Sequence, residues 1–145
     1  MTRSLSLLQR DSGGDFVQLL SLPHRSGTSV SGPAKLVQHV IAELLTRRGS
    51  VRHDRNYGCN LVGQIGVTNA SSLAEVGHAI NVAVSEVQDN MRARSIGNEP
   101  LDEILDRIVV EQLRQEQTQV VSVLRIYPRG GESVSYPLAL RFDEQ

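Results

Sequence analysis

Two groups of side chains in this 145-residue sequence have types and spacing that could support chemistry. Glu75 and His78 stand three residues apart, the spacing with which one helix supplies two ligands to a di-metal centre. Such a centre needs a second Glu-x-x-His pair and further carboxylates, and the sequence holds only this one pair. We therefore expect no metal ion, and we keep a metal-binding domain as an alternative interpretation.

The second group contains four carboxylates at helical spacing: Glu99, Asp102, Glu103 and Asp106. Paired carboxylates are the acid and base of glycoside hydrolysis, but acidic residues in the first turn of a helix also offset its dipole. With no Trp and only five Tyr and Phe, a sugar-stacking platform is hard to build. We expect no catalytic residues, and a small cytosolic lysozyme-like hydrolase using these carboxylates with Glu75 and His78 is the alternative.

The remaining motifs are weak. Gly58, Gly63 and Gly66 are not followed by the Gly-Lys-Ser/Thr of a phosphate-binding loop, so turns are the simpler interpretation. Cys59 is the only cysteine, which excludes a disulfide within the chain, and we expect it to be a small, semi-buried apolar residue. No cofactor is expected.

Composition and length indicate one globular domain, predicted over residues 33–145, after an N-terminal arm and loop over 1–32. The chain is 39% hydrophobic and 21% charged, which excludes the highly charged disordered class. Its apolar runs are far shorter than the roughly 20 residues that span a bilayer, and its first residues lack a signal-peptide pattern. We therefore expect no membrane contact and assembly in the cytoplasm.

Charge is divided unevenly along the chain. Residues 1–60 carry eight Lys and Arg against four Asp and Glu, and residues 61–145 carry seven against twelve. The two parts either face each other within one molecule or meet the opposite charge on another. Fourteen of the fifteen basic residues are Arg, which interfaces favour but codon usage would also produce. An acidic isoelectric point near 6.4 argues against nucleic acid as a partner.

The predicted helices occupy residues 33–47, 72–94 and 99–108, with a short helical piece over 61–67. Pro33 suits the first position of a helix, and Gly49 suits a left-handed stop after the first helix. The first helix has apolar residues on one face: Leu36, Val37, Val40, Ile41, Leu44 and Leu45. Ser72-x-x-Glu75 forms a capping box for the long second helix.

Two strands are predicted near the C-terminus, over residues 120–127 and 133–140, with a hairpin turn between them. Pro137 cannot donate a ladder hydrogen bond, so the second strand lies at an edge or meets a bulge. The change from helix to strand falls near residue 108. The fold class is therefore α+β: helices followed by a C-terminal antiparallel β-hairpin or meander over about 108–140.

Two segments in the middle of the chain share an order of motifs with a known family: 41–50 (Ile-Ala-Glu-Leu-Leu-Thr-Arg-Arg-Gly-Ser) and 56–61 (Asn-Tyr-Gly-Cys-Asn-Leu). In these segments the chain resembles the baseplate wedge and sheath-initiator family of contractile tails. The family, which includes phage tail protein W and subunits of type VI secretion and extracellular injection baseplates, has a helix ending in Leu-Leu-Thr-x-x-Gly, an aromatic-Gly turn and a C-terminal meander. The resemblance covers roughly residues 34–140. Glu99-Pro100 matches the start of the family's Glu-Pro-Arg motif, but Leu101 replaces its Arg.

The resemblance implies a non-enzymatic baseplate subunit that joins the wedge to the sheath and templates the first sheath ring by β-strand addition. It implies six copies per phage virion or phage-tail-like particle, with the sheath protein and other wedge and hub proteins as partners. The candidate sheath-binding residues are Val121, Val123, Arg125, Tyr127, Val134, Tyr136, Leu138 and Leu140. The candidate wedge-anchoring residues are Arg47, Arg48, Arg52, Arg55, Tyr57, Gly58, Glu99 and Pro100.

Overall fold

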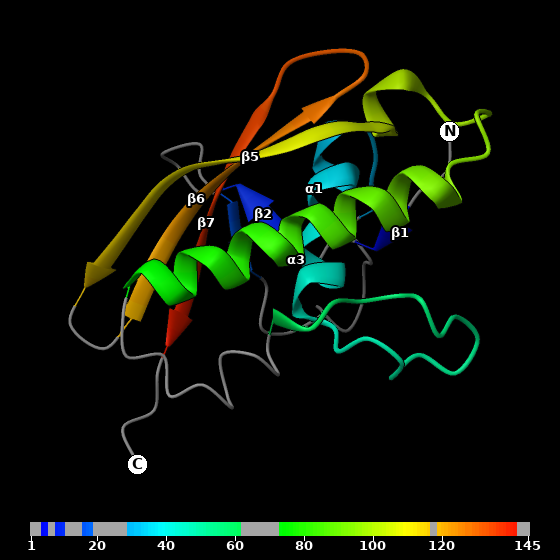
Figure 1. The fold of residues 1–145 in the computed structure, drawn as a ribbon. Helices are drawn as coiled ribbons and strands as arrows, with labels where there is room; N and C mark the ends of the chain where they lie inside the picture. Colours follow the sequence, from blue (N-terminus) through cyan, green and yellow to red (C-terminus); the bar gives the residue numbers. More distant parts are fainter. Residues whose placement is uncertain are drawn as a thin grey trace, which may run out of the picture.

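The computed structural model describes residues 4–5, 8–10, 16–18, 29–61, 73–116 and 119–141. Two helices precede a three-stranded antiparallel sheet, so the α+β prediction is confirmed (Figure 1). The main elements in chain order are α1 (Pro33–Leu45), α3 (Leu73–Arg94), the 3-10 turn η1 (Leu101–Glu103), β5 (Leu105–Glu116), β6 (Gln119–Pro128) and β7 (Val134–Arg141).

Helix α1 begins as predicted but ends two residues early. Pro33 stands in its first turn, after Gly32, whose φ of 68° is left-handed. The predicted end at residue 47 is wrong because Thr46 is extended and Arg47 forms a bridge with Cys59. Gly49 does have a left-handed φ of 84°, but it lies in the turn after this bridge and does not stop the helix.

Helix α3 agrees with the second predicted helix to within one residue at its start and ends at the predicted Arg94. Its apolar stripe is buried: Val76, Ile80, Ala83, Val84 and Val87. Ser72, the first residue of the predicted capping box, and the helical piece beyond Leu61 lie outside the described residues.

The sheet has the order β5-β6-β7, with Val110 opposite Leu124 and Leu124 opposite Tyr136. One face of the sheet carries the side chains that join the core of the two helices, including the fully buried Leu124 and Ile126. The other face is called the outer face below. It carries the alternate residues, among them Val123, Arg125 and Pro137.

The predicted third helix over residues 99–108 is wrong. Only the single turn η1 forms there, and β5 begins at Leu105. Two register shifts in β5, between Leu105 and Arg107 and between Val110 and Gln112, change the alternation of its side chains. The more buried residues of β5 are Leu105, Ile108, Val110 and Leu113. These residues are spaced by three, two and three positions across the two register shifts, and the spacing of three between Leu105 and Ile108 is also found on one face of a helix.

The described part of the N-terminal arm contains strands that the sequence did not predict. β1 (Ser4–Leu5) pairs with β4 (Ser29–Val30), and β2 (Leu8–Arg10) pairs with β3 (Phe16–Gln18), each pair antiparallel. Such short pairs have little hydrophobic periodicity to detect. Among the described residues, neither helix combines the length and hydropathy needed to cross a bilayer.

Because one face of the sheet is buried and the other is partly exposed, shortening side chains on the two faces should change the free energy of unfolding by different amounts. Leu124→Ala should lower the free energy of unfolding by about 2–5 kcal/mol because it opens a cavity in the core. Val109→Ala, on the outer face and 39% exposed, should cost no more than about 0.5 kcal/mol. Urea titration of both variants measures the difference, and equal costs would contradict the assignment.

Candidate functional site: a basic loop and an open sheet edge

The loop over residues 46–61, called the basic loop below, is fastened at its two ends. The Arg48 N–H donates to the Cys59 carbonyl at 3.1 Å, and the Cys59 N–H donates to the Thr46 carbonyl at 3.0 Å. The Cys59 thiol donates to the Leu44 carbonyl at 3.2 Å. Cys59 is 1% exposed, more deeply buried than predicted, and this burial raises the pKa of its thiol.

A buried carboxylate joins the basic loop to both helices. The Glu43 side chain on α1 is 1% exposed and forms an ion pair with Arg94 at the end of α3. Glu43 also accepts hydrogen bonds from the Gly58 N–H and the Asn90 amide, each at 3.4 Å. The Arg94 guanidinium lies over the Tyr57 ring, 4.9 Å from its centre. Tyr57 and Gly58 therefore belong to a packed joint between the helices and the loop.

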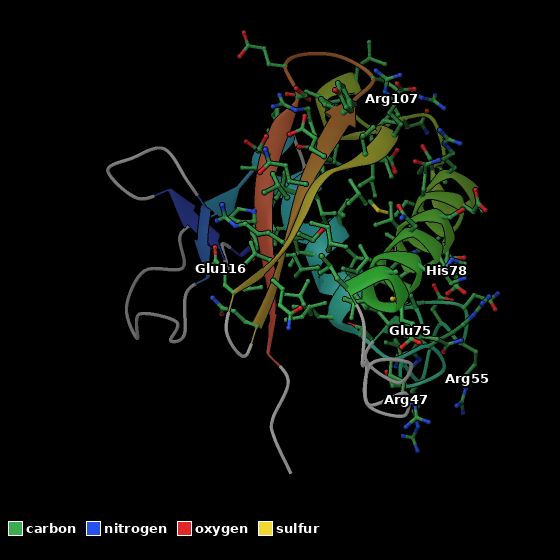
Figure 2. The ribbon with its side chains drawn as sticks, turned by 60° about the vertical axis from the view of Figure 1, so that its left-hand side comes forward. Arg47, Arg55, Glu75, His78, Arg107 and Glu116 are labelled. Carbon is green, nitrogen blue, oxygen red and sulfur yellow. The ribbon has the colours of Figure 1, made fainter. Side chains whose placement is uncertain are left out.

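The four predicted wedge-anchoring arginines of the basic loop are all exposed: Arg47, Arg48, Arg52 and Arg55. Figure 2 shows Arg47 and Arg55 projecting from the molecule away from the sheet. Arg55 donates to the Gly49 carbonyl at 3.1 Å and so holds the loop. Among the described residues, no carboxylate forms an ion pair with Arg47, Arg48 or Arg52. These three guanidinium groups are therefore exposed positive charges on a loop that is held by backbone and side-chain hydrogen bonds.

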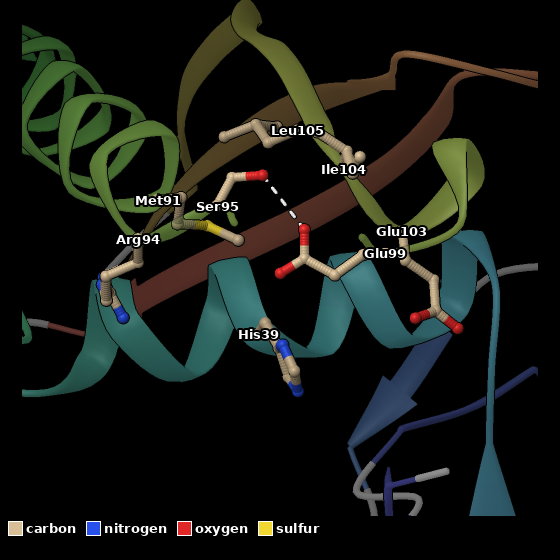
Figure 3. A pocket seen from close by; sticks show the side chains of 8 residues that line it. All are labelled: His39, Met91, Arg94, Ser95, Glu99, Glu103, Ile104 and Leu105. Atoms are coloured by element: carbon tan, nitrogen blue, oxygen red, sulfur yellow. Dashed lines mark hydrogen bonds between the residues drawn. The ribbon is translucent and has the colours of Figure 1, made fainter. Parts of the chain in front are cut away.

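A small pocket of about 140 Å³ lies between α1, the end of α3 and the start of β5 (Figure 3). Its lining residues are His39, Met91, Arg94, Ser95, Glu99, Glu103, Ile104 and Leu105. Partial burial, with Lys35 nearby, lowers the pKa of His39. Arg94 is the link between this pocket and Tyr57 of the basic loop.

The carboxylates of the pocket have structural partners. The Ser95 hydroxyl donates to Glu99 at 3.0 Å. Glu103 accepts from the Gly32 N–H at 3.0 Å and pairs with Lys35 at 3.0 Å, so it caps the start of α1 from η1. Glu99 thus lies in the pocket, and Pro100, which is exposed, precedes η1.

The structure does not bring the candidate metal and hydrolase residues together. Glu75 and His78 are exposed on the first turns of α3, and Glu75 precedes Arg94 by nineteen residues, which is about 28 Å along the helix. Glu99 follows the far end of that helix. Within the described ranges, no three His, Cys, Asp or Glu side chains cluster as a metal ion would need.

The predicted sheath-binding residues lie on two different faces of the sheet. Those on β6 (Val121, Val123, Arg125 and Tyr127) are on the outer face of the central strand, whose two edges pair with β5 and β7. Those on β7 (Val134, Tyr136, Leu138 and Leu140) face the core, and the first three are buried. Of the backbone edges of β6 and β7, only the outer edge of β7 has no partner among the described strands.

The outer edge of β5, in contrast, is partly covered by α3. Gln88 accepts the Ile108 N–H at 3.0 Å, and Arg92 donates to the Asp106 carbonyl. β5 also carries five charged residues, whereas residues 134–140 of β7 carry none. No described strand pairs with the outer edge of either β5 or β7.

Sequence reasoning missed Arg94, Asn90 and Glu43. The detectable signal was Glu43 itself, a carboxylate beside Leu44 on the apolar face of the first predicted helix, since a buried charge needs a partner. The partner was not identifiable because it lies 51 residues away.

Comparisons of the chain with models of protein families, with curated proteins and with solved structures found no match. The function is therefore inferred from the geometry of the basic loop and the sheet edges, together with the resemblance of residues 34–140.

The Glu43–Arg94 ion pair predicts that removing one partner costs more stability than removing the other. Arg94→Met should lower the free energy of unfolding by about 3 kcal/mol because it leaves the buried Glu43 uncompensated. Glu43→Gln should cost less, since Arg94 is 39% exposed and can be hydrated. The double variant should recover at least about 1 kcal/mol of the Arg94→Met loss. Chemical denaturation measures all three, and additive costs would show that the pair is not coupled.

The two left-handed glycines of the basic loop form a matched pair. A Cβ at Gly58 (φ 99°) would stand 2.5 Å from the Thr46 carbonyl oxygen, whereas a Cβ at Gly49 (φ 84°) would meet no atom within 4 Å. Gly49→Ala should cost about 1–2 kcal/mol for its backbone conformation alone. Gly58→Ala should cost clearly more because it must also displace Thr46. Thermal unfolding tests this order, and a Gly49→Ala variant as unstable as Gly58→Ala would contradict it.

Proposed function

We propose that this protein is a structural baseplate subunit of a contractile tail or injection machine, joining the wedge to the sheath. The observation that carries the proposal is the contrast between the two sheet edges. β5 is charged and partly capped by Gln88 and Arg92, whereas β7 is uncharged over residues 134–140 and pairs with no other described strand along its outer edge.

An unpaired edge strand carries a row of N–H and C=O groups that can accept another strand. Monomeric proteins block such edges with charges, prolines or covering elements because they promote aggregation. An assembly protein uses the same groups to capture an extended segment by β-strand addition. In the proposed role, sheath strands add at β7, and the subunit templates the first sheath ring.

The basic loop supports a second attachment. Arg47, Arg48 and Arg52 extend from a loop whose backbone is held by Cys59 and by the Glu43 network. Because the loop backbone is already hydrogen-bonded, pairing these arginines with carboxylates requires little further ordering of the backbone. We assign this surface to contact with an acidic face of the wedge, whose other proteins and hub proteins are the remaining partners. Family symmetry then gives six copies per particle, assembled in the bacterial cytoplasm.

Particle assembly tests both surfaces separately. In a strain lacking the wild-type gene, Ser135→Glu with Ala139→Glu should give baseplates without sheaths, because an added strand would desolvate the new charges without pairing them. Arg47→Glu with Arg48→Glu and Arg52→Glu should instead remove the subunit from baseplates. Electron microscopy of purified particles and immunoblotting distinguish the two results.

Ala74→Glu with Ala93→Glu is the matched control, since both alanines are exposed on α3, and this variant should assemble normally. Full-length sheaths on baseplates that contain the Ser135→Glu, Ala139→Glu variant would show that the sheath docks elsewhere.

A further inference from the structure

The direction of the backbone groups of β6 follows from a hydrogen bond on β5. The Ile108 N–H donates to Gln88 of α3, so this group points away from β6. Ile108 is opposite Ile126. Directly opposite residues of an antiparallel pair either bond to each other or both point their N–H and C=O groups away from each other. Since Ile108 points away from β6, Ile126 points its N–H and C=O away from β5 and toward β7. Ile126 therefore bonds to β7, and the alternate residues of β6 do the same.

The register of β6 and β7 then shows which backbone groups of β7 point toward β6 and which point toward its outer edge. Ile126 is opposite Val134, and the paired positions Tyr136 and Leu138 also direct their backbone groups toward β6. The positions between them direct theirs outward: Ser135, Pro137, Ala139 and Arg141. The position of Pro137 supports this assignment independently, because proline within a sheet occurs where no N–H has to bond to a neighbouring strand.

Pro137 therefore leaves a gap in the middle of the free edge. Ser135 and Ala139 each offer an outward N–H, while Pro137 offers only its carbonyl. A foreign strand that adds to β7 loses one hydrogen bond at this gap. Two copies of β7 that pair with each other lose two hydrogen bonds. When the two prolines are opposite each other, each proline carbonyl faces the partner's proline nitrogen, which has no proton to donate.

We infer that Pro137 makes the edge of β7 selective: it accepts an extended strand from a different protein and disfavours pairing with a second copy of this chain. The inference rests on the proposed function, in which the sheath supplies that strand. Each lost hydrogen bond weakens strand pairing by a factor of about 2 to 12. Because a homodimer contains two copies of Pro137, its pairing is weaker than that of a foreign strand by one further factor of this size.

The side chains beside the edge indicate the chemistry of the incoming strand. Pro137 and Ala139 are exposed on the outer face and stand next to the half-buried Val123. A neighbouring strand places alternate side chains beside these small apolar groups, where large apolar residues pack best. Residues 134–140 carry no charge, so they cannot form an ion pair with a charged side chain on the incoming strand. The preferred strand is thus uncharged, with bulky apolar residues on the outer face.

The first test uses the intact protein with a defined strand probe, a macrocyclic hairpin peptide that presents one strand of alternating Val and Thr and has its other edge N-methylated. Amide exchange by NMR should show fast exchange at Ser135 and Ala139 in the free protein and protection when the peptide is bound. Protection of these two amides in the free protein would mean that the edge is already covered, which would overturn the inference.

Two substitutions change the number of outward donors without touching a bond to β6. Ala139→Pro should weaken peptide binding by about 2- to 12-fold, and Pro137→Ala should strengthen it by a similar factor. Pro137→Ala should also produce dimers in sedimentation experiments at concentrations where the wild type is monomeric. Ala139→Val keeps the N–H and is the control, with unchanged or tighter binding. A wild-type dimer that Ala139→Pro dissociates would overturn the selectivity.

Purified sheath protein from the same particle separates this inference from the proposed function. If the peptide fails to bind, or binds the wild type, Ala139→Pro and Pro137→Ala equally well, the selectivity of the edge is overturned whatever the sheath does. If the peptide binds as expected but the sheath protein does not protect Ser135 and Ala139 and still assembles on Ala139→Pro baseplates, β7 is not the sheath site and only the proposed function fails. If the peptide binds β7 and baseplates lacking this subunit nevertheless assemble full sheaths, the proposed function fails and the selectivity of the edge stands.

Discussion

Burial of the Glu43 carboxylate is the constraint on which the helical half of this structure depends. A charge that is 1% exposed must be paired and hydrogen-bonded, because an isolated buried carboxylate is strongly unfavourable. Arg94, Asn90 and the Gly58 N–H supply these interactions. The end of α3 and the turn of the basic loop are thereby held against α1, and the exposed arginines are presented from a fixed support.

The sheet is governed by a second constraint, the hydrogen-bonding capacity of its backbone. The central strand β6 has both edges paired, and α3 satisfies two groups on the edge of β5 through side chains. The direction of the Ile108 N–H, combined with the register of the three strands, shows which backbone groups of β7 point outward. Strand pairing thus fixes the alternation of donors and acceptors across the whole sheet.

Sequence periodicity predicted the elements whose side-chain repeat is regular. The two long helices and the strands of the final hairpin were placed to within about two residues. It failed between residues 99 and 108, where the apolar residues at 101, 104, 105 and 108 have helical spacing but β5 begins at Leu105 with a register shift before Arg107. A helix and a bulged strand then have the same pattern, and only pairing with β6 distinguishes them. The arginines of the basic loop are visible in the sequence as a cluster of positive charge, whereas Tyr57 and Gly58 were singled out by the resemblance.

The sequence by itself determined the α+β class, the uncharged final strand with its proline and the cluster of arginines after the first helix, because each is a local property of residue type and spacing. Only the tertiary structure decided that Glu43 meets Arg94, that β6 is central and that β7 has no neighbour among the described strands on its outer side. These features depend on contacts between segments distant in the chain, whose geometry is set by packing and by the satisfaction of buried polar groups.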